Sequence, residues 1–551
     1  MNRSKILKNL PTDCLVEVLR HLKYDITSLY SCILVNRLWC KFSIPLLWCS
    51  PFEFTRHNNK AEFIIQTYVS CFSEEEKNQF YDKVFLIPDF QEVAPVFNYP
   101  SYLHNLDIPT FETAVRNWFH GIWKNYAPES SKFSLSSFSI CKRIIGHMLF
   151  KRSIGFRALK MSRDEQDHTF YFDMLTNSGI QLRLSQLQRF ELCYNVTRNN
   201  DAKLIVEGII KLFSTLSRYV HKLNHISFIF GTESPILQLN VAKAFADLIK
   251  SQNKLKSLEL YKFWDQSTAN EIYSALNSQS NSLECLKILG AKDFIQMLPF
   301  LESCCKLETL YITPSIINSE TITWREIPLK NLYFHHYTEP KMITSTMSPI
   351  LRMSTKTLTS LTLQRVNLEH LKIIEKYCQL LKSLTLSISC SQLSRFCKII
   401  SLMELESLTL KKVLDDLTFD ITSVQDLALS IPKSLLFFGI GFKMSPQTLA
   451  LFLRKCRAKL IGLDLYYYFN MIDDSYLEVF IQHAEYNHCF ERLNFEEAPS
   501  THLKSVLDRP SKLLEHAKRH NFLKSYVALN GLQLQLQLEE EDVIGDCTGV
   551  I

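Results

Sequence analysis

The sequence predicts an α/β protein in which short strands alternate with helices in a long series of small repeats. Three observations favour this class. One spacing, apolar-x-x-apolar-x-apolar, recurs thirteen times from residue 156 onward. The copies that begin at Leu255, Leu381 and Leu405 are nearly identical and read LKSLEL, LKSLTL and LESLTL. Many copies follow an amphipathic helical pattern, so each repeat supplies one strand and one helix.

The thirteen copies begin at intervals of 22 to 36 residues, and this near-regular spacing indicates a repeat architecture. Their first residues are Phe156, Leu187, Leu223, Leu255, Leu283, Leu307, Leu329, Leu358, Leu381, Leu405, Leu435, Leu460 and Phe490. A strand and a helix at this period are typical of leucine-rich repeats. One unit cannot bury its apolar face alone, so neighbours stack into a solenoid with strands on the concave face and helices on the convex face. We therefore expect leucine-rich repeats over residues 151–502.

Two features of the repeats leave questions open. A large α/β domain could also alternate strands and helices, although it would not reuse one strand sequence so faithfully. The Asn or Cys expected three residues past each strand is mostly missing, as at Ala291 and Tyr468. The polar ladder that this position normally supplies is therefore in doubt, and we expect irregular curvature.

Residues 9–52 form a separate, small, all-helical region. Pro11, followed by Thr12 and Asp13, marks a helix start. Apolar residues then recur at helical spacing over two short helices, and they are Leu15, Val18, Leu19, Leu22, Leu29, Ile33, Leu34 and Val35. Pro45 and Pro51 are expected to limit a last short helix. Roughly forty residues bury little core by themselves, so we expect this region to need a protein partner.

The other regions are harder to assign. Residues 53–150 are dense in aromatic residues and poor in glycine, which favours a helical connector packed on the repeats. Residues 503–551 contain an alternating Gln–Leu run followed by an acidic run at 539–542. The Gln–Leu run could add a strand that caps the repeats, or the acidic tail could be disordered. We expect a C-terminal cap and acidic tail that is partly disordered.

The composition excludes several classes of function. The net charge of +6 over 551 residues does not indicate a nucleic-acid surface, and no run approaches the ~18 apolar residues of a membrane helix. The N-terminus lacks the apolar core of a signal peptide, so we expect a cytoplasmic or nuclear protein with reduced cysteines. Glycine is scarce, and no phosphate-binding loop, metal motif or cofactor site is present in the sequence.

No catalytic group stands out either. Cys40 and Cys49 are beside tryptophans and are better interpreted as packing residues. His516 and His520 are one helical turn apart, but the sequence offers no third metal ligand near them. We expect a protein without an active site, metal or cofactor.

The N-terminal region resembles an F-box, the module by which substrate receptors dock into Skp–cullin–F-box (SCF) ubiquitin ligases. The match opens at Leu10 and Pro11, continues through the run Leu34-Val35-Asn36-Arg37-Leu38-Trp39, and closes at Trp48. Asn36 departs from the Ser or Cys that is more usual there. The resemblance implies that the adaptor-facing residues are Leu10, Pro11, Leu15, Val18, Leu22, Leu29, Val35, Trp39 and Trp48.

An F-box followed by leucine-rich repeats is a known architecture, and the chain is similar to fungal-type members of it. The resemblance implies a substrate-recognition subunit of an SCF-type E3 ubiquitin ligase, without catalysis of its own. Its partners would be a Skp-type adaptor, through it a cullin and a RING subunit, and an unidentified protein substrate. No nucleic acid or membrane is implied. The alternatives are a non-catalytic repeat scaffold and a ligand sensor without a ligase role.

Substrate is expected on the strand face that carries the residues between the apolar positions. This face is rich in Thr, Ser and Tyr, although strand propensity alone also favours Thr and Tyr. Aromatic residues often anchor protein interfaces. The residues predicted to contact substrate are Tyr261, Tyr311, Tyr333, His335 and Tyr466.

Overall fold

The computed structural model describes most of the chain up to residue 496. The described ranges are 11–53, 61–84, 95–126, 135–162, 170–196, 202–232, 234–264, 266–291, 297–313, 325–334, 340–364, 366–412, 421–466, 474–487, 489–490 and 492–496. The chain divides into two compact units, Met1–Gln279 and Ser280–Ile551. Leu10, His335 and the predicted tail 503–551 lie outside the described residues.

The first unit begins with helices and continues with strand–helix repeats. Its helices are α2 (Thr12–His21), α3 (Ile26–Ile33), α4 (Arg37–Leu47), α5 (Ala61–Ser70), α6 (Glu74–Val84), η3 (Tyr99–Tyr102), α7 (Ile108–Tyr126), α8 (Leu135–Arg152), α9 (Phe170–Leu175), α10 (Ser178–Leu184), α11 (Ala202–Tyr219), α12 (Pro235–Lys250), α13 (Gln266–Leu276) and η4 (Asn277–Gln279). Its strands are β1 (Asn105–Asp107), β2 (Ala158–Ser162), β3 (Arg189–Val196), β4 (His225–Thr232) and β5 (Ser257–Trp264).

The second unit consists of strand–helix repeats. Its strands are β6 (Cys285–Ala291), β7 (Thr309–Ile312), β8 (Asn331–Phe334), β9 (Ser360–Leu363), β10 (Ser383–Ile388), β11 (Ser407–Lys412), β12 (Phe437–Gly441), β13 (Gly462–Tyr466) and β14 (Arg492–Glu496). Its helices are α14 (Leu298–Ser303), α15 (Pro340–Met353), α16 (Leu368–Tyr377), α17 (Cys390–Ile400), α18 (Ile421–Ser430), α19 (Pro446–Lys455) and α20 (Asp474–Tyr486).

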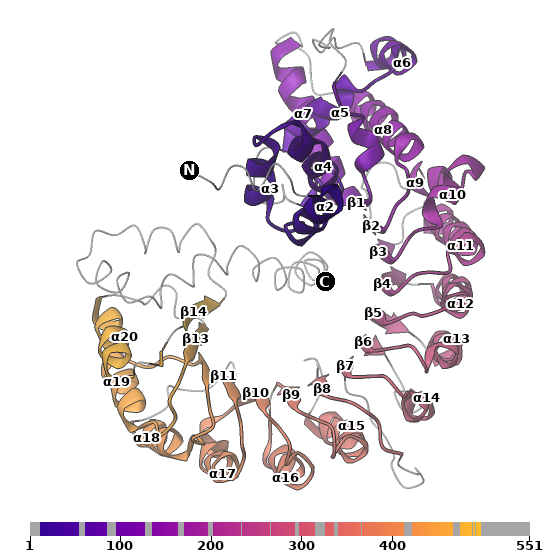
Figure 1. The fold of residues 1–551 in the computed structure, drawn as a ribbon. Coiled ribbons are helices and arrows are strands. Elements are labelled where there is room, and N and C mark those ends of the chain that lie inside the picture. The colour runs from indigo at the N-terminus through magenta and orange to yellow at the C-terminus, as the bar shows by residue number, and fades with distance from the viewer. Residues whose placement is uncertain are drawn as a thin grey trace. The chain divides into compact units, whose positions relative to one another are not determined.

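Within each unit every strand pairs in parallel with the strand that follows it in the sequence. The apolar repeat positions share one register, so Leu361 of β9 pairs with Leu384 of β10, and Leu384 with Leu408 of β11. These side chains are buried beneath the helices. Figure 1 shows α11, α12 and α13 side by side along β3–β5, and α16–α19 along β9–β13. Each of the thirteen predicted copies contains a strand, which confirms the leucine-rich-repeat fold.

One strand precedes the predicted series. Strand β1 lies inside the range that the sequence assigned to the connector, and it pairs in parallel with β2. Leu103, Leu106 and Ile108 have the same spacing as the other copies, and all three are buried. The strand–helix series of the first unit therefore starts near residue 103.

Other polar residues take the place of the Asn or Cys side chains that are missing after the strands. Buried Gln252 accepts a hydrogen bond from the Leu223 N–H at 3.1 Å and donates to the Val220 carbonyl at 2.8 Å. Gln279 repeats this contact on the next turn, with the Leu255 N–H at 3.2 Å. In the second unit the hydroxyl of Thr357 donates to the Leu329 carbonyl at 2.9 Å. The turns that precede the strands are therefore tied together by side chains from the helix ends.

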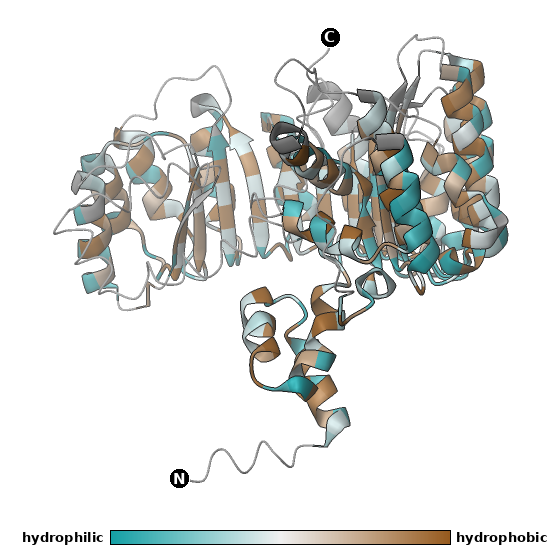
Figure 2. Cartoon of the chain, turned by 90° about the horizontal axis from the view of Figure 1, so that it is seen from above, coloured by the Kyte–Doolittle hydropathy of each residue, from teal (hydrophilic) through white to brown (hydrophobic). Residues whose placement is uncertain are grey.

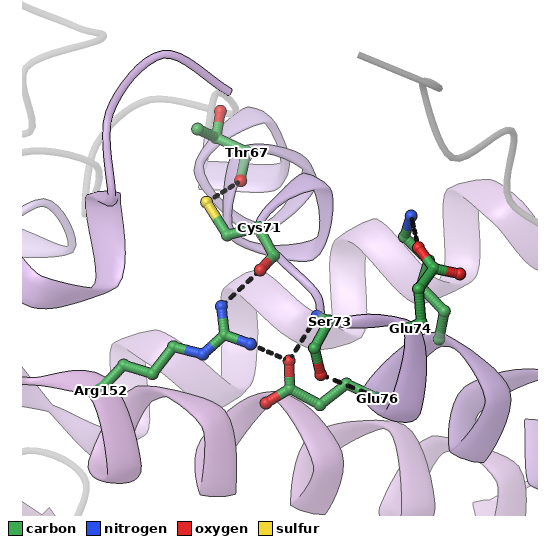
Figure 3. Close-up of polar contacts among 7 residues, drawn as sticks. Thr67, Cys71, Ser73, Glu74, Glu76 and Arg152 are labelled. Atoms are coloured by element: carbon green, nitrogen blue, oxygen red, sulfur yellow. Dashed lines mark hydrogen bonds and ion pairs between the residues drawn. The ribbon is translucent and has the colours of Figure 1, made fainter. Parts of the chain in front are cut away.

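Helices α5–α8 pack as a layer beside the first strands. Figure 3 shows Arg152, at the end of α8, bonded to the Cys71 carbonyl and to the Glu76 carboxylate. Glu76 also accepts a hydrogen bond from the Ser73 N–H at 2.8 Å at the start of α6. Deeper in the layer, the buried Lys142 ammonium forms an ion pair with Glu112 at 3.0 Å.

Two glycines of β12 show why the Gly439-Ile440-Gly441 run is not a phosphate-binding loop. Gly439 pairs with Thr409 of β11, and a Cβ atom at 439 would come within 2.5 Å of the Thr409 hydroxyl. A Cβ at Gly441 would come within 2.9 Å of the Lys411 backbone. Glycine at these positions allows close strand approach. Across the described ranges, we find no helix long and apolar enough to cross a bilayer.

Candidate functional site

The N-terminal module, helices α2–α4 with Trp48, has a small core of its own. Leu15, Leu19, Leu29 and Cys32 are buried in it. Side chains that pack partly against this core are Leu22, Trp39, Phe42, Leu46 and Leu47.

Both later helices of the module have side-chain caps. The Asp25 carboxylate accepts from the Ser28 N–H at 3.0 Å and from its hydroxyl at 2.6 Å, and these bonds lower the pKa of Asp25. The Asn36 side chain accepts from the Leu38 and Trp39 N–H groups at 2.9 and 3.0 Å. Asn is a favourable N-cap residue, so Asn36 caps α4 although it differs from the Ser or Cys that is usual in the F-box pattern.

Helix α4 continues through Pro45, contrary to the expected break there. Proline inside a helix loses one backbone hydrogen bond, because it has no N–H. The helix is still closed behind it by the Trp48 N–H, which donates to the Ile44 carbonyl at 3.0 Å. Trp48 is thus positioned by α4 itself.

Seven large apolar side chains of the module are exposed. Ile26, Tyr30 and Leu34 follow at four-residue spacing and therefore lie along one face, with Leu34 73% exposed. The exposed apolar residues of the module are Val18, Tyr24, Ile26, Tyr30, Leu34, Val35 and Leu38. Single exposed apolar residues are ordinary, but their concentration between residues 18 and 38 is typical of an interaction site.

The residues predicted to face an adaptor fall into three groups. Pro11, Val18 and Val35 are exposed. Leu22, Trp39 and Trp48 are half-buried, whereas Leu15 and Leu29 lie inside the core of the module. Five exposed apolar residues are absent from the predicted set, namely Tyr24, Ile26, Tyr30, Leu34 and Leu38. Their signal in the sequence is that these short helices carry more apolar residues than one buried face can hold.

The module is attached to the first strand by hydrogen bonds and to α5 and η3 by aromatic packing. The Cys49 carbonyl accepts from the N–H groups of His104 and Asn105 at 3.0 and 2.8 Å. The Trp48 ring packs on Tyr68 and Tyr99, with centroid distances of 5.2 and 4.4 Å. Figure 2 shows the helices nearest the N-terminus projecting away from the strands, with brown, hydrophobic segments among them. The exposed apolar residues are therefore held on a module that is fixed to the first strand.

The second unit presents a polar row on the strand face opposite its helices, here called the open strand face. One residue per strand contributes to each row because the strands are in register. The row formed by the middle of β6–β13 is Lys287, Tyr311, Tyr333, Thr362, Thr385, Thr409, Gly439 and Asp464. Only Lys287 and Asp464, at its ends, bear charges, so the row suits hydrogen bonding more than ionic binding.

Four of the predicted substrate residues can be placed in the structure. Tyr311 and Tyr333 stack at 4.0 Å with an interplanar angle of 4°, and the Lys287 ammonium lies 5.4 Å from the Tyr311 ring centroid. Tyr466 is only 8% exposed, with Lys411 4.5 Å from its ring centroid. Tyr261, in the first unit, is half-buried. Of these four residues, the structure brings together Tyr311 and Tyr333.

The open strand face of the first unit is charged. Lys160 of β2 lies between Asp107 and Glu191, at 4.0 and 3.8 Å. The Glu259 carboxylate accepts from the Ser227 and Tyr261 hydroxyls at 3.4 Å each. Burial lowers the pKa of His225 and nearby Arg189 lowers it further, against the raising effect of Glu259 and Glu191.

Several buried cysteines have a raised pKa, which is the opposite of activation. Burial raises the pKa of Cys304 and of Cys378 to about 12, and it raises that of Cys49 despite a hydrogen bond to Ser50. A thiolate nucleophile needs a lowered pKa, so these thiols behave as packing groups. Within the described residues, no cluster of three or more His, Cys, Asp or Glu could hold a metal ion.

These features define a leucine-rich-repeat protein with an N-terminal helical module. No protein-family model matches the chain, and no curated protein matches it. Among solved structures, the leucine-rich-repeat-containing protein LegL7 of Legionella pneumophila is 12% identical, over 66% of this chain and 97% of that one, with a TM-score of 0.32. A chain of the yeast Rad7 and Elc1 complex is 14% identical, over 63% of this chain and 77% of that one, with a TM-score of 0.33. Because both TM-scores lie below 0.5, neither structure informs the function.

Proposed function

We propose that the chain is the substrate-recognition subunit of an SCF-type E3 ubiquitin ligase, and that it is not itself an enzyme. In this proposal the N-terminal module docks a Skp-type adaptor, which brings the cullin and RING subunits. The repeats bind the protein substrate. Ubiquitin transfer then follows from proximity, because one chain holds substrate and ligase at high effective concentration.

The observation that carries this proposal is the set of seven exposed apolar residues on the module. The core of the module is filled by other side chains, so these seven are not needed to complete it. Two of them are tyrosines, a residue type enriched among interface hot spots. The resemblance of the module to an F-box suggests a Skp-type adaptor as the protein that these residues would bind.

The attachment of the module supports the same proposal. A docking module can present its partner in one orientation only if the module is itself fixed to the residues that follow it. The Cys49 hydrogen bonds and the Trp48 ring contacts hold the module against the rest of the first unit. A loosely tethered module would lack these contacts.

Reconstitution tests the proposal. The purified chain is mixed with the host's Skp-type adaptor, cullin and RING subunit, and assembly is followed by size-exclusion chromatography. We expect one complex with the wild-type chain and none with Leu34→Asp/Val35→Asp, whereas the control Leu402→Asp assembles normally, since Leu402 is 80% exposed on the second unit. Adaptor binding without the cullin would favour a non-degradative scaffold, and no adaptor binding would refute the proposal.

The open strand face of the second unit is the proposed substrate site. The stacked pair of Tyr311 and Tyr333 offers flat aromatic area beside a row of threonines. We expect Tyr311→Ser/Tyr333→Ser to lose a subset of the proteins that co-purify with the wild-type chain. Tyr486→Ser, at a tyrosine that is 89% exposed on α20, is the matched control. An unchanged set of co-purified proteins would place the substrate site elsewhere.

A further inference from the structure

The open strand face of β7–β11 carries two uncharged polar rows. Residues of β7, β8 and β9 alternate between half-buried and buried, which places every second side chain on this face. One row is the part of the row described above that runs from Tyr311 to Thr409. The row before it is Thr309, Asn331, Ser360, Ser383 and Ser407. We call these two rows together the neutral patch, because each of its side chains carries a hydroxyl or an amide and none is charged.

The hydroxyls at the centre of the neutral patch have no partner within the described part of the chain. At its border the Asn331 amide donates to the Thr309 hydroxyl at 3.1 Å, so those two side chains are bonded to each other. The side-chain hydroxyls without a hydrogen bond to any described residue are those of Ser360, Thr362, Ser383 and Thr385. Gln364 directly follows β9, and its buried Oε1 atom also meets no hydrogen-bond partner among the described residues. These groups are therefore available to a ligand.

The first unit shows that the repeats do not require such a patch. On its open strand face the charged side chains bond to one another: Arg189 pairs with Glu191 at 2.5 Å, and Lys160 lies between Glu191 and Asp107. Strand propensity favours threonine and tyrosine, but it does not account for serine on three successive strands. The free hydroxyls are therefore a property of the second unit, and neither the fold nor propensity explains them.

Charged residues at the borders of the neutral patch have partners of their own. Those that directly precede its strands pair at 2.6 Å, and the pairs are Lys330 with Glu308 and Lys382 with Glu406. At the two sides, Lys287 and Lys411 each lie against a tyrosine ring, with centroid distances of 5.4 and 4.5 Å. A charged group at the centre of the patch would lose water without gaining an ion pair, and this makes its binding unfavourable.

We propose that the neutral patch binds an uncharged, unphosphorylated segment of the substrate protein, whose hydroxyl, amide and backbone groups complete the hydrogen bonds of the patch. This inference rests on the proposed function, in which the open strand face of the second unit is the substrate site. An apolar segment would bury the free hydroxyls unsatisfied, and a charged one would be desolvated without a counter-ion. The rejection of charged segments is then a source of specificity.

Selection from a library of random peptides, displayed on phage, tests the inference with the purified full-length chain as bait. Five strands at about 4.8 Å spacing span about 19 Å, which about six extended residues cover, so peptides of about twelve residues are long enough. We expect the selected peptides to be enriched in Ser, Thr, Asn and Gln and depleted in Asp, Glu, Lys and Arg relative to the unselected library.

Two measurements on a synthetic copy of a selected peptide report the role of charge. Its affinity should change less than about twofold between low salt and about 1 M salt, because salt screens only interactions between charges. Phosphorylation of a serine or threonine within the peptide should weaken binding about tenfold or more, since the phosphate adds a charge of about −1.5 to −2.

Two variants of the neutral patch locate the binding. Thr362→Val/Thr385→Val keeps the shape of the face and removes two free hydroxyls, so we expect about tenfold weaker peptide binding. Ser360→Ala/Ser383→Ala is a second such pair, with a similar loss expected. The control Thr215→Val/Thr355→Val removes two hydroxyls outside the strands and should bind like wild type. Thermal unfolding shows that each variant is folded.

The outcomes separate this inference from the proposed function. Selection of charged peptides, or tighter binding of the phosphorylated peptide, would overturn the inference and leave the proposed function in place. Selection of no peptide, or equal binding by wild type and both patch variants, would overturn it as well, because the patch would then not hold a peptide segment. Failure of the wild-type chain to bind the adaptor would refute the proposed function, and this is measured independently of peptide binding.

Discussion

The backbone N–H of Asn105 donates a 2.8 Å hydrogen bond to the carbonyl of Cys49, and this bond joins the N-terminal module to the first strand. The Asn105 side chain adds a bond of 2.6 Å to the Ser50 hydroxyl. Later turns of the first unit use the same backbone pattern, in which one carbonyl accepts from two successive N–H groups. The module is therefore joined to the repeats in the way that one repeat is joined to the next.

The ring contacts of Trp48 predict how firmly the module is held. Trp48→Ala removes packing against Tyr68 and Tyr99, and we expect amide exchange in α4 to become at least about tenfold faster, since deletion of large aromatic packing costs several kcal/mol. Hydrogen–deuterium exchange mass spectrometry measures this. Trp48→Phe retains a ring, so its α4 amides should exchange at a rate between those of wild type and Trp48→Ala. Equal exchange in all three chains would show that the hydrogen bonds alone fix the module.

The buried glutamines predict a cost specific to the repeat turns. Gln252→Ala leaves the Leu223 N–H and the Val220 carbonyl without their side-chain partner, at about 1–3 kcal/mol for each buried group. We expect a lower free energy of unfolding in urea, with Gln186→Ala, at an exposed glutamine, as the neutral control. A Gln252→Ala chain as stable as this control would mean that the hydrogen bonds of Gln252 do not stabilise the turns.

The ion pair between α7 and α8 predicts a non-additive pair of substitutions. Lys142→Met leaves the Glu112 carboxylate without its buried cation, which should destabilise the first unit by about 3–5 kcal/mol. Lys142→Met/Glu112→Leu removes both charges and should recover a large part of that loss. Thermal unfolding of the three chains measures the coupling. A double variant as unstable as the sum of the two single variants would contradict the account of this pair.

His483 on α20 predicts a dependence of stability on pH. Burial lowers its pKa from 6.5 to about 4, and its Nε2 atom meets no hydrogen-bond partner among the described residues. Between these two values the unfolded chain binds the proton that the folded chain does not, so stability falls as pH falls from 6.5 toward 4. The loss at pH 4.5 is about 2–3 kcal/mol. His483→Leu cannot titrate, so its Tm relative to wild type should rise between pH 7 and pH 4.5; a constant difference would contradict the assignment.

The repeats could be predicted from the sequence because their signal is local. Each copy places three apolar residues at a fixed spacing, and their burial beneath a helix needs no knowledge of distant residues. Strand β1 follows the same rule at Leu103, Leu106 and Ile108, but it stands beside long helices and was assigned to the connector.

The division of the module into core and surface could not be predicted in the same way. Leu15 and Val18 are both apolar residues of α2, yet Leu15 is buried and Val18 is 49% exposed. Which of them packs inside depends on where α3 and α4 lie, and this is a property of the tertiary structure. The role of Gln252 and Gln279 at the turns could not be predicted either. These glutamines reach the turns from the ends of neighbouring helices, so their contacts also depend on the tertiary structure.

The measurement that tests the central claim most directly is the affinity of the purified full chain for its host's Skp-type adaptor, by isothermal titration calorimetry at several temperatures. We predict a one-to-one complex with a negative heat-capacity change, which marks burial of apolar surface. We also predict at least about hundredfold weaker binding for Leu34→Asp/Val35→Asp, because hot-spot losses reach several kcal/mol. Absence of binding by the wild-type chain, or equal binding by the double variant, would contradict the account.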